Sequence, residues 1–259
     1  MMISRRAVVI KSPQEIEIMR KAGRINALAL DTVRNMIQPG ITTSELDKAA
    51  SDVIRKHGAT PAFKGYPGPY PFPATITVSI NEELVHGIPG KRRLKEGDIV
   101  SIDCGTILDG YVADSAFTIG VGKISPASRQ LLEVTEEALY RGISKMIAGN
   151  RVGDVSAEIQ KHVEGHGFHV PREYTGHGVG REMHEGPNVP NYGVKGRGLL
   201  LKTGVTIALE PMVLVGTHQT RVLNDDWTVV SADGSLTAHF EHSVAVMDGE
   251  PLLLTVVEN

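Results

Sequence analysis

The chain has 259 residues, of which 41% are hydrophobic and 22% charged, and a formal net charge of −3. These values suit a globular protein with a sizeable core and give no reason to expect binding to DNA. The single cysteine, Cys104, excludes an intramolecular disulfide and a cysteine-built zinc site. No apolar stretch is long enough for a signal peptide or a membrane span, so we expect a cytoplasmic protein without a membrane partner.

Helix signals open the chain. Ser12-Pro13-Gln14-Glu15 has the pattern of a capping box with proline at the first helical position, and it predicts a helix that Pro39-Gly40 stops. A second box, Thr42-Thr43-Ser44-Glu45, predicts a helix ending at Gly58. Strand-like segments follow, from residue 75 to 80 and then to about residue 121.

The same order of signals then restarts. Ser125-Pro126 predicts a helix to about residue 148, and Asp154 is expected to cap another that ends near residue 165. Gly40 and Gly149 are 109 positions apart, and so are Gly58 and Gly167. We therefore expect one domain, 1–259, built by duplication from pseudo-repeats at about 12–121 and 125–247. The alternative is a chance echo between two helix–helix–strand segments.

Two aspartates flank a turn signal between β-rich runs. Asp109-Gly110 is typical of a two-residue hairpin loop, which would pair Leu108 with Tyr111. Asp103 and Asp114 then become diagonal neighbours on one face of the sheet. Their mutual repulsion favours a cation between them, although a solvated polar face is the alternative.

Further candidate ligands lie in the second half. Glu210 ends the apolar run 205–209, and Glu241 lies in the predicted strand 237–246. A buried glutamate is costly unless it is paired or bound to metal, and for one glutamate a salt bridge is the usual answer. Two glutamates together with the aspartate pair favour a metal centre. His177 and His184 lie in a glycine-rich loop, and His86 precedes Gly87-Ile88-Pro89. The other histidines are interpreted as structural or surface residues: His57, His162, His166, His169, His218, His239 and His242.

Four carboxylates and an imidazole suit a paired site for Mn, Fe, Co or Zn ions rather than a tetrahedral structural zinc. Taken in order, these residues resemble the type I methionine aminopeptidases, which are pita-bread metallopeptidases. The resemblance covers nearly the whole chain and includes the segments His86-Gly87-Ile88-Pro89, Gly176-His177-Gly178-Val179-Gly180 and Glu210-Pro211-Met212. It implies a duplicated α+β fold, in which an antiparallel sheet is covered by helices in pseudo-twofold halves. Because the first helix starts at residue 12, the chain resembles the short bacterial form without a zinc-finger extension.

The resemblance also implies a role for each matching residue. Asp103 would bind one of two divalent ions, and Asp114 and Glu241 would bridge both. His177 and Glu210 would complete the second site, with Glu210 also serving as general base. His184 would stabilise the oxyanion, and His86 would contact the scissile amide.

The family's methionine pocket is aromatic, and the matching positions here are Phe63, Tyr66, Thr77, Met183 and Trp227. Three departures concern this pocket. Met183 replaces a common phenylalanine, Thr77 replaces a common cysteine, and the proline-rich segment 65–73 lengthens the stretch between Tyr66 and Thr77. We expect that segment to form an ordered surface loop beside the site, although it could bind a proline-recognising module.

The implied activity is removal of the initiator methionine from nascent proteins with a small second residue. We expect a monomer whose partners are nascent-protein N-termini. For the basic segment Lys91-Arg92-Arg93 with Lys95, a solvated turn is favoured over transient docking to the ribosome, which the family implies. The alternative functions are an Xaa-Pro peptidase or prolidase of the same fold, and a non-catalytic peptide-binding protein.

Overall fold

The computed structural model describes residues 7–257, which form a mixed α+β fold. No helix within this part of the chain is long and apolar enough to cross a membrane. The helices it contains are α1 (Pro13–Met36), α2 (Thr43–Lys56), α3 (Pro126–Ile143) and α4 (Val152–Gly165). The strands are β1 (Thr60–Pro61), β2 (Ile76–Ile80), β3 (Glu83–Val85), β4 (Ile99–Leu108), β5 (Tyr111–Gly120), β6 (Thr175–Gly178), β7 (Glu185–Pro190), β8 (Thr206–Leu209), β9 (Met212–Leu214), β10 (Thr220–Val222), β11 (Val229–Ser231), β12 (Thr237–His239), β13 (Glu241–Ala245) and β14 (Leu252–Leu253).

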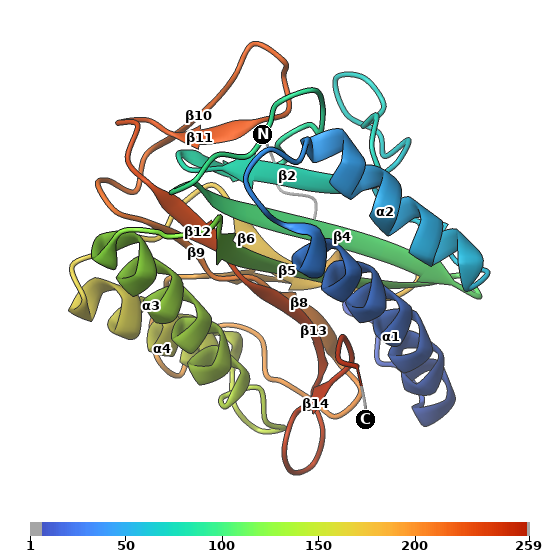
Figure 1. Cartoon of the computed structure of the whole chain (residues 1–259). Helices are drawn as coiled ribbons and strands as arrows, with labels where there is room; N and C mark the ends of the chain where they lie inside the picture. The colour runs from blue at the N-terminus through green and yellow to red at the C-terminus, as the bar shows by residue number, and fades with distance from the viewer. Residues whose placement is uncertain (1–6, 258–259) are drawn as a thin grey trace.

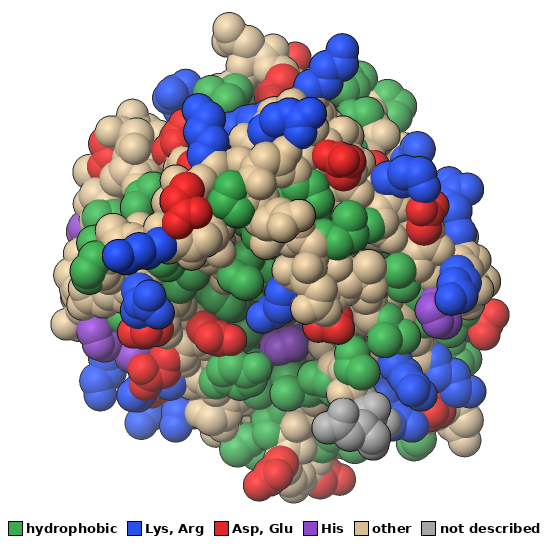
Figure 2. Space-filling view, viewed as in Figure 1, with side chains coloured by type: hydrophobic (Ala, Val, Ile, Leu, Met, Phe, Trp, Pro, Cys, Tyr) green, Lys and Arg blue, Asp and Glu red, His purple; other side chains and the backbone are tan. Residues whose placement is uncertain are grey.

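One nine-stranded antiparallel sheet organises the molecule. Its main path is β1-β4-β5-β13-β8-β6-β7, with β2 paired to β4 and β14 paired to β13. Figure 1 shows the helix pairs α1–α2 and α3–α4 side by side on the same side of this sheet. The largest core cluster joins helices and sheet through residues such as Leu46, Ile102 and Leu139. Figure 2 shows basic and acidic side chains interspersed over the helix-covered face.

The hairpin prediction is confirmed. Leu108 pairs with Tyr111, and this register runs without a bulge to the pair Ile99–Gly120. Asp109 and Gly110 take the positive φ values, 49° and 75°, that a two-residue type I′ turn requires.

The predicted helix starts are largely confirmed. Ser12 and Thr42 cap α1 and α2 through complete capping boxes. We expected Asp154 to be the cap of α4, but it is the third helical residue. Its carboxylate accepts a 2.8 Å hydrogen bond from the backbone N–H of the N-cap residue Arg151. The third helix also ends earlier than predicted, at Ile143. Ser144 follows it, and the Ser144 hydroxyl donates a hydrogen bond to the Arg141 carbonyl in the last turn of the helix.

Two strand predictions need correction. The predicted strand 237–246 is divided at Phe240 between β12 and β13, because the Phe240 N–H donates to the carbonyl of Pro211, outside the large sheet's ladder. The glycine-rich segment from Thr175 starts as a strand, β6, before it becomes a loop.

The two halves match in backbone conformation on either side of α2 and α4. Gly40 and Gly149 have φ values of 93° and 97°, and Gly58 and Gly167 have values of 74° and 79°. Gly58 and Gly167 directly follow the C-caps of α2 and α4, and Gly40 and Gly149 lie two residues before the N-caps of the same helices, so residues 109 positions apart take the same left-handed conformation at corresponding places. We propose an internal duplication on this basis.

Candidate metal centre and substrate cavity

Strand register places the predicted acids on one face of the sheet. Asp103 of β4 and Glu241 of β13 both pair with Ala116 of β5, from its two sides. Asp114 lies two residues from Ala116 on the same strand, and alternate residues of a strand share a face. The neighbouring Ser115 accordingly points to the other face, where its hydroxyl donates to Asn26 of α1. The three acids therefore project away from the helices.

The second half adds His177 and Glu210 to this face. His177 pairs with Ala208 of β8, and Glu210 follows two residues later. The His177 Nε2 lies 3.5 Å from Glu210 Oε1 and 3.9 Å from Asp114 Oδ2. Its Nδ1 lies 3.0 Å from the Gly178 carbonyl, and such a bond on one ring nitrogen aims the other at a metal.

The donor atoms converge as a metal site requires. Ligand atoms of Asp114, His177 and Glu241 all lie within 4.8 Å of one another. Among residues 7–257, Oδ1 of Asp103, Oδ1 of Asp114 and Oε1 of Glu241 are buried without a hydrogen-bond partner. Buried carboxylate oxygens are costly to leave unpaired, and hard oxygen donors bind divalent cations well. These residues therefore fit a divalent metal ion.

The electrostatics of the four acids agree with this interpretation. Burial raises the pKa of Asp103 to about 7, although hydrogen bonds with the Asp114 side chain and the Cys104 backbone act to lower it. Burial, followed by the negative charges of its neighbours, raises the pKa of Asp114 and of Glu241 well above the usual range. The pKa of Glu210 is raised by burial and by Asp103. Without a cation the four groups cannot all be ionised.

His86 and His184 lie at the rim of this acidic group. His86 has a φ of 61°, and a non-glycine residue in that left-handed region at a cavity is a candidate functional residue. Gly87 is required beside it, since a Cβ there would lie 2.2 Å from the Val78 carbonyl oxygen. Burial lowers the pKa of His86 to about 4. The Tyr66 hydroxyl lies 2.6 Å from His184 Nδ1 and orients that ring.

A cavity of about 130 Å³ brings together every site residue predicted from the sequence. Its lining consists of Phe63, Tyr66, Phe72, Thr77, His86, Asp103, Asp114, His177, Met183, His184, Glu210, Trp227 and Glu241. The lining thus combines acids and histidines with aromatic side chains and Met183.

Phe72 was missed by the sequence analysis. It belongs to the proline-rich segment, which is closed on itself by the hydrogen bonds Gly65 N–Phe72 O and Phe72 N–Tyr66 O, of 2.8 and 3.0 Å. The Phe72 ring is 3% exposed and packs edge-on against Trp227 at a centroid distance of 5.2 Å. No signal within the loop distinguished it from its neighbours, although the expectation of an ordered loop beside the site is confirmed.

His239 was interpreted as a structural histidine, but it lies directly against the acidic group. Its Nε2 is 3.7 Å from Glu210 Oε2 and 3.6 Å from Glu241 Oε2. Burial lowers the pKa of His239 to about 3. A signal was available in the sequence, because two positions separate His239 from Glu241 in the predicted strand, and such residues share a face.

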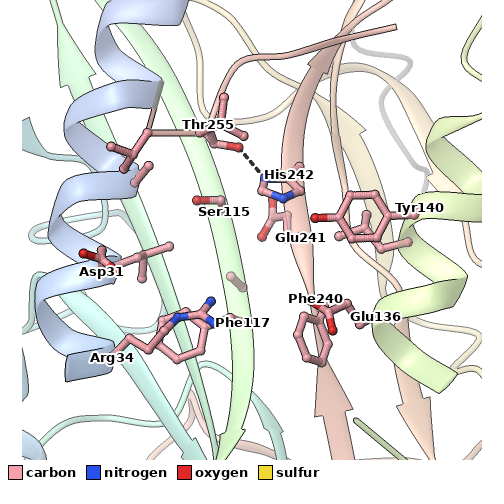
Figure 3. A pocket seen from close by; sticks show the side chains of 16 residues that line it. Asp31, Arg34, Ser115, Phe117, Glu136, Tyr140, Phe240, Glu241, His242 and Thr255 are labelled. Carbon is pink, nitrogen blue, oxygen red and sulfur yellow. Dashed lines mark hydrogen bonds between the residues drawn. The ribbon is translucent and has the colours of Figure 1, made fainter. Parts of the chain in front are cut away.

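A second, larger cavity of about 440 Å³ lies on the helix side of the sheet, between α1 and α3. Figure 3 shows Arg34, Asp31, Tyr140 and His242 around it. His242 was interpreted as a structural histidine, and its Nδ1 lies 2.8 Å from the Thr255 hydroxyl. Of the predicted site residues only Glu241 lines this cavity, so the chemistry belongs to the opposite face.

A cavity lined by three buried carboxylates, the partly buried Glu210, several histidines and aromatic side chains defines a metal-dependent hydrolase. The chain belongs to metallopeptidase family M24, whose family model matches residues 17–248. It is therefore an enzyme of a family that uses divalent metal. A methionine aminopeptidase of Clostridium perfringens is 48% identical over 97% of this chain and 100% of its own length.

Solved structures show the same relationship. The crystal structure of methionine aminopeptidase from Thermotoga maritima matches with a TM-score of 0.94 and 45% identity, over 96% of this chain and 99% of that one. A prolidase from Pyrococcus furiosus shares the fold at a TM-score of 0.77, with 24% identity over 97% of this chain but 66% of its own. The pita-bread fold is thus confirmed, and the sequence relationship favours the aminopeptidases over the prolidases.

Proposed function

We propose that this chain is a methionine aminopeptidase, which hydrolyses the peptide bond after the N-terminal methionine of proteins whose second residue is small. The observation that carries this proposal is the single cavity, whose lining combines a carboxylate-rich group with aromatic side chains and Met183 that suit a thioether. Methionine aminopeptidases at 48% identity across the full length support it.

We propose that two divalent ions bind at the carboxylate-rich group. Two such ions would balance the charge of four ionised carboxylates, which otherwise repel one another. Asp103 would hold one ion, Asp114 and Glu241 would contact both, and His177 and Glu210 would complete the second site. When bound, the ions would polarise the scissile carbonyl and supply a nucleophile at neutral pH. The donor set suits Co, Mn, Fe or Zn ions.

Three side chains of the cavity would transfer protons or donate hydrogen bonds during the reaction. The Glu210 carboxylate would accept a proton from the attacking water and return it to the leaving amine nitrogen. His86, held in place by its left-handed backbone, would contact the scissile amide. His184, oriented by the Tyr66 hydroxyl, would donate to the developing oxyanion.

The apolar side chains of the cavity lining would bind the methionine side chain. Phe63, Thr77, Met183 and Trp227 would surround it, with Phe72 as a further wall. Met183 is a polarisable residue that adapts to a thioether, so its presence in place of phenylalanine is compatible with methionine. An adjoining open cavity shares Tyr66, Met183 and His184 with the first, and it offers a path for the rest of the peptide.

We further propose a cytoplasmic, monomeric enzyme that acts on nascent chains. Ribosome docking through the basic segment has less support. Arg92 is paired with Glu83 at 2.7 Å, and Arg93 donates to the Gly40 carbonyl. Because both arginines are engaged within the chain, these contacts favour a structural turn over a ribosome-binding segment.

The test is hydrolysis of Met-Ala-Ser and of an Xaa-Pro peptide by metal-stripped enzyme that is reloaded with Co, Mn, Fe or Zn ions. We expect cleavage of Met-Ala-Ser, dependent on the added ion, with little cleavage of the Xaa-Pro peptide. Preference for Xaa-Pro would favour a prolidase, and inactivity with every ion would favour a binding protein. His86→Ala should retain metal and lose most turnover, whereas wild-type rates would remove His86 from the mechanism.

A further inference from the structure

His239 occupies a position that the proposed chemistry does not use. Its side chain is almost completely buried, and its Nε2 has no hydrogen-bond partner within the described residues. The nearest acceptors are the outer oxygens, Oε2, of Glu210 and Glu241, at 3.7 and 3.6 Å. These distances differ by only 0.1 Å, so the nitrogen lies midway between two proposed metal ligands.

The backbone of His239 is held by the side chain of Thr118 on β5. Its N–H donates to the Thr118 hydroxyl at 2.9 Å, and that hydroxyl donates to the His239 carbonyl at 2.7 Å. Ser101 lies 2.8 Å from the same hydroxyl and completes the chain of hydrogen bonds. Because these hydrogen bonds fix the His239 backbone to β5, they also fix the position of its imidazole next to the two glutamates.

The glutamates use their other oxygens toward the proposed metal position. Glu210 Oε1 faces His177 Nε2 at 3.5 Å, and Glu241 Oε1 is buried and unpartnered. The compact group of ligand atoms comprises Asp114, His177 and Glu241, and His239 is not part of it. With the metal ions bound and both glutamates ionised, neither carboxylate has a hydrogen to give, so the His239 nitrogen that faces them would be the donor.

We propose that His239 is a positioning residue, whose Nε2–H is shared between the outer oxygens of Glu210 and Glu241 and turns their inner oxygens toward the metal ions. This inference rests on the proposed metal centre. Outer partners of metal ligands fix ligand orientation, and their loss typically lowers metal affinity by about 10–100-fold.

The test compares three variants after removal of metal with a chelator. His239→Gln keeps an N–H donor at about the same reach, and His239→Leu removes it at similar volume. His162→Leu is the matched control, since His162 on α4 is also a buried histidine whose Nε2 lacks a hydrogen-bond partner. Calorimetric titration with Mn²⁺ or Co²⁺ alone gives affinity and stoichiometry, the visible spectrum of the Co²⁺ form reports the ligand set, and circular dichroism checks folding.

We expect His239→Leu to bind the ions about 10-fold or more weakly with an unchanged Co²⁺ spectrum. His239→Gln should recover most of the affinity, and His162→Leu should match the wild type. Wild-type affinity in His239→Leu, or equal losses in the Leu and Gln variants, would overturn the positioning role. A Co²⁺ spectrum that shows the loss of a nitrogen ligand would instead make His239 a direct ligand. Failure of the wild-type protein itself to bind either ion would refute the metal centre, and is therefore distinguishable.

Discussion

Asp103→Asn is expected to stabilise the metal-free protein relative to the wild type as the pH rises from 5 to 7. Burial raises the pKa of Asp103 to about 7 from 3.8. Between these two values the folded state holds a proton that the unfolded state has released. Stability conferred by Asp103 is therefore highest at acidic pH and is lost as the pH rises toward 7. Asparagine has nearly the same shape and does not titrate.

The magnitude follows from the size of the pKa shift. A fully developed difference of one proton costs about 1.4 kcal/mol per pH unit. Asp103 in the folded state begins to ionise near pH 7, so the full difference of one proton is not maintained. The stability difference between Asp103→Asn and wild type is therefore expected to change by about 2 kcal/mol from pH 5 to 7. His86, His239 and His242 have lowered pKa values and act in the opposite direction. They are present in both proteins, so their contributions largely cancel in the comparison.

The assay is urea-induced unfolding of both proteins at pH 5, 6 and 7 with a chelator present. Asp109→Asn, an acid-to-amide change at the exposed turn of the same hairpin, controls for the substitution itself. A difference between Asp103→Asn and wild type that stays constant over the three pH values would refute the assigned burial effect. Added Mn²⁺ should stabilise the wild type more than Asp103→Asn, because the variant lacks one proposed ligand.

Three further predictions concern metal, packing and substrate. Wild-type protein at an Mn²⁺ concentration of about 100 times Kd should gain about 2.7 kcal/mol in unfolding free energy, and no gain would contradict a folded-state site. Asn26→Ala should lower stability by about 2 kcal/mol or more in the same assay, because it leaves the Ser115 hydroxyl and the Cys104 carbonyl without their buried partner; a change below 0.5 kcal/mol would argue against this anchor. Trp227→Ala should raise KM for Met-Ala-Ser about 10-fold with metal affinity unchanged. Gly68→Ala should raise KM less, since its Cβ would lie 2.4 Å from the Trp227 ring; unchanged KM in both would remove Trp227 from the pocket.

The parts of the site that could be predicted are those with local causes. A two-residue turn sets the parity of both hairpin strands, so the shared face of Asp103 and Asp114 followed from Asp109-Gly110 alone. Capping boxes likewise marked the helix starts at Ser12 and Thr42.

The parts that escaped prediction depend on distant contacts. Phe72 reaches the cavity because the proline-rich loop folds back and packs on Trp227, a residue 155 positions away in the chain. The division of the strand at Phe240 depends on the Pro211 carbonyl. For His239, the two-residue spacing from Glu241 was a usable signal, and only its approach to Glu210 depends on the fold.

The position of the metal centre within the sheet has a consequence for how the two halves hold together. Asp103 and Asp114 come from the first half, and His177, Glu210 and Glu241 from the second, so neither half contains a complete site. Within the large sheet the halves meet where β5 pairs with β13, through two register pairs, one of which joins Glu241 to Ala116. Without a cation, the acids at this seam repel one another across it. Ions bound there would replace that repulsion with bonds to residues of both halves, so we expect metal binding to stabilise the contact between them.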